Sequence, residues 1–118
     1  FQAIDMYIRR PHGIILVEGP IDFAALVQWG LDAEYLLVCS LGTAHTRALE
    51  AIQTHAPAGP VFLACDMDAA GEAAAVKIAE RLGSRARRLR WAGAKDCGEL
   101  LAQGGVGEAV FRQALTAR

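Results

Sequence analysis

The apolar residues of the chain gather in short runs that are separated by stretches with helical spacing. Three of these runs, residues 13–17, 35–38 and 61–65, are continuous and aliphatic, which is typical of strands buried on both faces of a parallel sheet. The run at residues 85–91 is interrupted by arginines, so it predicts a strand nearer the edge of that sheet. Residues 1–12 show little periodicity and are interpreted as a leading segment.

Helical spacing predicts five helices, most of which begin or end at a small residue. The third has the clearest pattern, since Ala74, Ile78 and Leu82 fall on one stripe and Gly83 provides a stop. The predicted helices extend from Asp22 to Gly30, from the turn at residues 40–43 to the break at 57–60, from Gly71 to Gly83, and over residues 99–102 and 106–115.

Strands and helices therefore alternate along the chain, with about 25 residues from one strand to the next. This alternation predicts βαβ units, in which right-handed crossovers place helices on both faces of a parallel sheet. With 118 residues, the chain is long enough for one domain with a proper core and short for two. We expect a single α/β domain over residues 1–118, with a parallel sheet of about four strands.

Composition narrows the class of partner and the compartment. The formal net charge is −1 and the isoelectric point is about 6.3, so a bound polyanion has to be held locally rather than by a field over the whole surface. No apolar run approaches the ~20 residues that cross a bilayer, and we expect a soluble protein without membrane contact. Cys39, Cys65 and Cys97 lie far apart, which favours a reducing cytoplasm over a disulfide or zinc framework. The chain begins with Phe1, and we interpret it as part of a longer protein.

Acidic residues follow two of the buried strands. Glu18 comes directly after the first strand, with Asp22 four residues later, and Asp66 and Asp68 come directly after the third. The carboxyl ends of parallel strands meet at one edge of a sheet, so these carboxylates are expected to converge. Converging carboxylates repel one another unless a cation neutralises them, and oxygen ligands favour Mg²⁺ or Mn²⁺. The sequence therefore predicts metal-dependent phosphoryl or phosphodiester chemistry.

Simpler interpretations exist for each of these residues. Asp22 is also placed to be only the N-cap of the following helix, Glu18 an ordinary turn residue, and Asp66 with Asp68 part of a solvated loop. That interpretation needs two coincidences, because two acidic turns follow two separate buried strands. A phosphohydrolase of the haloacid-dehalogenase type remains an alternative, although its DxD follows an early strand. A receiver domain needs paired acids after its first strand, and a module that binds metal without turnover is a further alternative.

Four short segments resemble the motifs of one family in order and separation. Residues 18–22 resemble EGxxD, residues 41–43 are LGT, residues 66–71 resemble DxDxxG, and residues 95–101 resemble KDPDELL. Together these motifs resemble those of the Toprim domain, most closely in bacterial-type DNA primases from bacteria, plasmids or phages. The resemblance covers the chain from around Gly13 onward.

The resemblance implies a Toprim fold, which is Rossmann-like, and a divalent metal, Mg²⁺ or Mn²⁺. It implies the catalytic domain of an enzyme that synthesises RNA primers on single-stranded DNA from ribonucleoside triphosphates. It also implies contact with a replicative helicase through regions outside this chain. A Toprim nuclease or recombination-type domain is the alternative within the family. By itself the chain is expected to be monomeric, to bind metal weakly and to make little or no primer.

The resemblance also implies roles for individual acids. Glu18 corresponds to a glutamate that acts as general acid/base or metal ligand, and Asp66 and Asp68 correspond to the metal-binding pair. Asp22 is a supporting acid, and Asp96 matches the first acid of the last motif. The chain departs from the family pattern in that motif, where Cys97 replaces the usual proline and Gly98 replaces the second acid.

Basic residues suggest where a polyanion would bind. Arg85, Arg87, Arg88 and Arg90 lie within six residues of one another and are candidates for contact with a nucleic-acid backbone. A solvated edge strand protected by charge is the alternative interpretation. Lys95 is the base nearest the acidic motifs and is a candidate for contact with a rim carboxylate or a triphosphate.

Overall fold

The computed structural model describes residues 12–40, 45–56 and 58–117, and in this part of the chain four strands form one sheet. Its strands are β1 (Ile14–Val17), β2 (Leu36–Cys39), β3 (Val61–Leu63) and β4 (Ala86–Arg88), in the order β2-β1-β3-β4. Each neighbouring pair is parallel. The predicted α/β class and parallel sheet are therefore confirmed.

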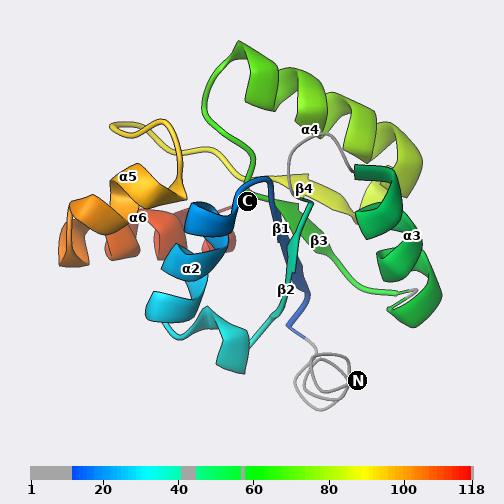
Figure 1. Cartoon of the computed structure of the whole chain (residues 1–118), viewed down its shortest axis with the longest axis horizontal. Coiled ribbons are helices and arrows are strands. Elements are labelled where there is room, and N and C mark those ends of the chain that lie inside the picture. Colours follow the sequence, from blue (N-terminus) through cyan, green and yellow to red (C-terminus); the bar gives the residue numbers. More distant parts are fainter. Residues whose placement is uncertain (1–11, 41–44, 57, 118) are drawn as a thin grey trace.

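Helices cover both faces of the sheet (Figure 1). Helices α3 and α4 pack on one face, and α2, α5 and α6 pack on the other. The bounds are α2 (Pro20–Gln28), α3 (His45–His55), α4 (Ala69–Leu82), α5 (Cys97–Ala102) and α6 (Gly105–Thr116), with short 3-10 helices η1 (Leu31–Ala33) and η2 (Gly83–Arg85). None of the helices in the described part of the chain combines the length and the apolar character that a membrane span requires.

Strand β1 lies at the centre of the core, and all four of its residues are at most 1% exposed. Ile14 and Leu16 belong to the apolar cluster under α3 and α4, whereas Ile15 and Val17 belong to the cluster under α2, α5 and α6. Successive side chains of a strand point to opposite faces, so a continuous apolar run is what a strand covered on both faces requires.

Several element boundaries differ from the sequence prediction, among them the end of β3 at Leu63 instead of Cys65. Helix α2 begins at Pro20 with Gly19 as its N-cap, because proline presets the dihedral angle of the first helical position. Asp22 therefore lies inside the first turn, and its interpretation as the N-cap was wrong. Strand β4 covers only three residues of the predicted 85–91 strand, since Arg85 completes η2 and the chain leaves β3 after Arg88. Residues 41–43 and 1–11 lie outside the described residues.

Helix α6 is held by aromatic packing. Phe111 is fully buried, with ring centroids 5.2 Å from Trp29 and 5.5 Å from Trp91. Arg112 of the same helix donates from Nη2 to the Trp29 carbonyl at 2.7 Å. The two tryptophans therefore pack against the same buried ring of α6.

Two cysteines are fully buried, Cys65 after β3 and Cys97 at the start of α5, and Cys39 is partly buried. Burial raises the pKa of the Cys65 thiol to about 12, which keeps it neutral. All three are free thiols, in agreement with the prediction of small buried side chains rather than a disulfide framework.

Candidate metal centre

The strand order places the carboxyl ends of β1 and β3 side by side. The chain passes from β1 outward to β2 on one side and from β3 outward to β4 on the other, so the neighbouring strands β1 and β3 flank a topological switch point. Glu18 follows β1 and Asp66 follows β3, and the Asp66 N–H donates to Glu18 Oε1 at 3.4 Å. The convergence of the two acidic turns is therefore confirmed.

Three carboxylates meet at this edge of the sheet. One oxygen each from Asp22, Asp66 and Asp96 lies within 4.8 Å of the others. These residues come from the first turn of α2, the loop after β3 and the N-terminus of α5. A hard cation binds oxygen ligands at about 2.0–2.6 Å, so atoms at this separation suit a shared ion.

Backbone N–H groups orient two of these side chains. Asp22 is buried, with 8% of its surface exposed, and its Oδ1 accepts a hydrogen bond from the Gly98 N–H at 3.2 Å. Asp96 is the N-cap of α5 and accepts from the Glu99 N–H at 2.9 Å. The glycine that replaces the second acid of the last motif thus contributes its backbone N–H to the carboxylate cluster.

The loop that carries Asp66 is packed tightly against α4. A Cβ added to Gly71 would lie 2.0 Å from the Asp66 carbonyl oxygen, so only glycine allows the helix to approach this closely. On its other side the loop is tied to the last motif, because the Met67 N–H donates to the Lys95 carbonyl at 2.6 Å. The two loops that carry Asp66 and Asp96 are therefore held together by their backbones.

Crowding of the carboxylates changes their protonation. Burial, followed by the charges of Asp22, Glu18, Asp96 and Asp68, raises the pKa of Asp66 from 3.8 to about 6. Burial also raises the pKa of Asp22, with the neighbouring carboxylate of Asp96 adding to the shift and the Gly98 N–H opposing it. A proton or a cation relieves the repulsion, which gives the cluster affinity for either.

Asp68 lies differently from Asp66. Its Oδ1 caps α4 by accepting from the Gly71 N–H at 2.7 Å, and its Oδ2 lies 3.7 Å from the ammonium group of Lys95. Among the described residues it is not part of the three-carboxylate cluster. Its role as a metal ligand stays a prediction, while the predicted proximity of Lys95 to a rim carboxylate is confirmed.

Glu18 has a second neighbour at the start of α3. Its Oε2 lies 4.0 Å from His45 Nε2, and His45 Nδ1 is buried without a hydrogen-bond partner.

A small pocket of about 350 Å³ lies beside the loop after β3 and is lined by Asp68, Glu72 and Trp91 among others. Glu72 was not among the predicted site residues, since a carboxylate in the first turn of a helix is common and carries no signal of its own.

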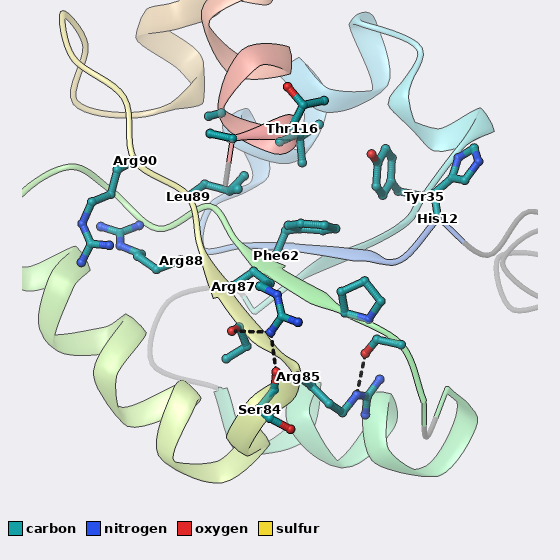
Figure 2. Close-up of a pocket in the computed structure, with 16 residues that line it drawn as sticks. His12, Tyr35, Phe62, Ser84, Arg85, Arg87, Arg88, Leu89, Arg90 and Thr116 are labelled. Carbon is teal, nitrogen blue, oxygen red and sulfur yellow. Dashed lines mark hydrogen bonds between the residues drawn. The ribbon is translucent and has the colours of Figure 1, made fainter.

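The four predicted arginines line one groove but differ in what they bind. Arg85 donates to the carbonyls of Ala56, Ala58 and Gly59, and Arg87 donates to those of Ser84 and Ala86. All four arginines line a groove of about 1160 Å³ beside β4, together with aromatic residues such as Tyr35 and Phe62 (Figure 2). Contact between these arginines and nucleic acid stays a prediction.

Arg88 is directed toward the acidic loop rather than toward solvent. Its side chain is 11% exposed and donates to the carbonyls of Cys65 and Asp66. The sequence pattern suggested a nucleic-acid contact, whereas most of the guanidinium surface is in contact with this chain.

Comparison with known proteins supports the fold and identifies the family. A family model described as Toprim-like matches residues 15–101. A DNA primase domain from Pseudomonas aeruginosa is similar with a TM-score of 0.68 and 26% identity, over 96% of this chain and 36% of that one. The primase fragment of the bacteriophage T7 primase-helicase protein is similar with a TM-score of 0.68 and 25% identity, over 82% of this chain and 41% of that one.

A further structural likeness concerns the fold alone. A chain from a structure of bacteriophage T7 lagging-strand DNA polymerase interacting with primase domains has a TM-score of 0.74 at 23% identity, over 89% of this chain and 54% of that one. This chain thus spans 54% or less of the length of these solved chains. No curated protein sequence matches the chain.

Proposed function

The chain belongs to the Toprim-like family, and we propose that it is the metal-binding catalytic domain of a bacterial-type DNA primase. The domain would take part in joining ribonucleotides into an RNA primer on single-stranded DNA. Its similarity to primase domains of Pseudomonas aeruginosa and bacteriophage T7 supports this proposal. Because the chain spans about half of these proteins or less, it is proposed to be one part of a longer, cytoplasmic enzyme.

The observation that carries the proposal is the cluster of Asp22, Asp66 and Asp96, which brings together one acid from each of three separate motif segments. These three residues would hold Mg²⁺ or Mn²⁺, with Glu18 and Asp68 at its border. When bound, such an ion neutralises and orients the phosphate oxygens of a nucleotide. The raised pKa values of Asp22 and Asp66 fit a site that exchanges protons for metal.

Residues beside the cluster would handle the proton and the substrate. Glu18 keeps Oε1 on the Asp66 N–H and is the proposed proton acceptor at Oε2. Lys95 has a side chain that is 54% exposed beside Asp68, which is suitable for contact with a triphosphate. Arg87 is exposed on the outer strand and is proposed to contact the template backbone, with Arg85 adding charge nearby.

The proposed partners are single-stranded DNA and ribonucleoside triphosphates, with a replicative helicase contacted through other regions of the protein. One of the similar structures contains primase domains bound to an RNA/DNA hybrid, and another comes from a primase-helicase protein, which supports both kinds of partner. The isolated chain is expected to bind metal and to make little or no primer.

A Toprim nuclease or recombination-type domain is the second candidate, because the same acids would serve hydrolysis. The position of Asp96 inside the cluster favours primase, since it belongs to the segment that resembles the KDPDELL motif of primases. The DxD phosphohydrolase alternative is disfavoured by the family match and by the position of the DxD after β3.

Manganese titration tests the proposed site. The wild-type chain is expected to remove Mn²⁺ from the free pool, as followed by electron paramagnetic resonance, and Asp66→Asn is expected to weaken binding by about tenfold or more. Asp32→Asn is the matched control, because Asp32 is an exposed acid on η1 outside the carboxylate cluster. Equal Mn²⁺ binding by the wild type and Asp66→Asn would show that the carboxylate cluster is not the metal site. Primer synthesis by the longer protein, lost in the same variant, distinguishes primase from nuclease.

A further inference from the structure

The guanidinium group of Arg88 occupies the space between the end of β4 and the loop after β3. Its Nη1 donates to the Cys65 carbonyl at 2.8 Å and lies 3.5 Å from the Leu63 carbonyl, and its Nη2 donates to the Asp66 carbonyl at 2.9 Å. With 11% of the side chain exposed, these bonds are largely screened from water. Two successive backbone carbonyls beside the acidic centre, those of Cys65 and Asp66, thus accept hydrogen bonds from one side chain.

This loop needs a donor because the sheet ends there. The last backbone bond from β4 to β3 is Leu89 N–H to the Leu63 carbonyl at 3.0 Å, and on the other side Ala64 N–H donates to Leu16 of β1. Beyond Ala64, the carbonyls of Cys65 and Asp66 receive the guanidinium instead. A buried carbonyl without a partner costs about 1–3 kcal/mol, so the arginine continues the sheet's hydrogen bonding beyond its last residue.

Glu72 holds the guanidinium in this orientation. Its Oε1 lies 3.3 Å from Arg88 Nε, and its Oε2 lies 2.7 Å from Arg90 Nη2. Figure 2 shows that Arg88 and Arg90 extend toward the same side, away from Arg85. Since Glu72 lies in the first turn of α4, it links the helix that packs on Asp66 to the arginine that binds the Asp66 carbonyl.

We propose that Arg88 is a positioning residue that sets the affinity of the carboxylate cluster for a divalent cation by fixing the backbone of Asp66. The Asp66 N–H is bound by Glu18 and its carbonyl by Arg88, so the direction of the Asp66 side chain follows from two fixed points. A lysine cannot replace it, because one ammonium group does not reproduce the planar fork that reaches two carbonyls. The inference rests on the proposed metal site.

The chain contains a matched control at the opposite end of β4. Arg85 also binds backbone carbonyls with its guanidinium, from Nε to Gly59 at 2.8 Å and from Nη2 to Ala56 at 2.7 Å. It holds the loop that leads into β3 instead of the loop that leaves it. A loss of affinity caused by general weakening of the fold would therefore appear in variants of both arginines.

The experiment compares Arg88→Met, Arg88→Lys and Arg85→Met by Mn²⁺ titration and by the free energy of unfolding in chelator. Both Arg88 variants are expected to bind Mn²⁺ about 10–100-fold more weakly. Arg85→Met is expected to lose stability while its affinity stays within about twofold of the wild type. Metal-free amide exchange is the second readout, in which the Asp66 and Met67 amides are expected to exchange faster only in the Arg88 variants.

Each outcome bears on the proposal. Wild-type affinity in Arg88→Met, full rescue by Arg88→Lys, or an equal loss in Arg85→Met would overturn it. If Arg88→Met does not fold, Glu72→Gln keeps the arginine but removes its orienting charge, and unchanged affinity there also overturns the proposal. If the wild type binds no Mn²⁺, the proposed function fails separately, whereas unchanged amide exchange in the Arg88 variants refutes the positioning role without reference to metal.

Discussion

The two ends of the β3–β4 pair use the same device for different purposes. At the amino end Arg85 binds the carbonyls of the loop before β3, and at the carboxyl end Arg88 binds those of the loop after it. At the amino end, the residues that line the groove around Arg85 are Gly59, Pro60, Ser84 and Ala86, and none of these is acidic. At the carboxyl end three carboxylates lie within 4.8 Å. Backbone support is therefore common to both ends, and the side chains that the supported loop presents decide where a site can form.

The largest effect is expected from a substitution at the amino end of α4, where Gly71 packs against the acidic loop. Gly71→Ala would place a methyl group 2.0 Å from the Asp66 carbonyl, so the helix and the acidic loop must move apart. We expect a loss of about 2–3 kcal/mol in the free energy of unfolding and weaker Mn²⁺ binding by about tenfold or more. Urea denaturation in chelator and Mn²⁺ titration measure the two effects.

Gly83→Ala is the control at the other end of α4. Gly83 has φ of +64° but no atom within 4 Å of an added Cβ. The substitution is expected to cost about 1–2 kcal/mol through backbone strain, with unchanged Mn²⁺ affinity. If both alanine variants weaken Mn²⁺ binding equally, then the loss of affinity does not depend on the contact between Gly71 and the acidic loop.

A charge added to each end tests the comparison more finely. Gly98→Asp restores the acid that the last motif lacks, with the new Cβ 3.0 Å from Ile21 Cγ2, a side chain that is 71% exposed and free to rotate. We expect Mn²⁺ affinity to rise by about 3–10-fold, while repulsion lowers the metal-free free energy of unfolding by about 1 kcal/mol. Ser84→Asp adds the same charge at the amino end and is expected to leave the affinity unchanged. Mn²⁺ titration of both variants measures these affinities. An affinity of Gly98→Asp equal to that of the wild type would contradict the expected gain.

The smallest expected effect is on the pH dependence of stability. The folded-state pKa of Asp66, about 6, lies above its ordinary value of 3.8, so the folded chain binds this proton more tightly than the unfolded chain does. The resulting stabilisation is complete below about pH 3.8 and is lost as the pH rises through about 6, by roughly 1 kcal/mol after allowance for solvent screening. Affinity for Mn²⁺ changes in the opposite direction, because metal competes with the proton.

Urea denaturation of the metal-free chain between pH 4.5 and 7.5 measures this dependence. Asp66→Asn is expected to flatten the profile, whereas Arg85→Met is expected to lower the whole curve without changing its slope. A wild-type profile that is already flat would show that the crowding of carboxylates at the carboxyl end has no energetic consequence.

The sequence was sufficient for the sheet and for the meeting of the two acidic turns. A continuous run such as Ile14–Val17 has one common explanation, burial on both faces, and parallel strands then bring Glu18 and Asp66 to one edge. Asp22 follows from its place one turn after Glu18, and the family motifs extended the set to Asp96. Both steps depend on spacing along the chain and on topology, which a sequence carries directly.

Side-chain direction was the part that the sequence could not provide. Asp66 and Asp68 are two residues apart and chemically identical, yet one faces the cluster and the other caps α4, because helix geometry determines which carboxylate reaches the free N–H groups. Arg88 likewise turns inward because β3 leaves the sheet after Leu63, a boundary that the apolar run through Cys65 does not mark. The directions of these side chains depend on the exact residue at which each strand ends.

The aromatic contact of α6 has a consequence for where the folding unit ends. The family match stops at residue 101, but Phe111 lies beyond it and packs between Trp29, which follows α2, and Trp91, which follows β4. During synthesis from the amino end, the part of this sheet face that α6 covers would therefore stay exposed until the last helix has been made. The cooperative unit reaches at least to Leu115, and a boundary drawn at the motif match would cut through its core.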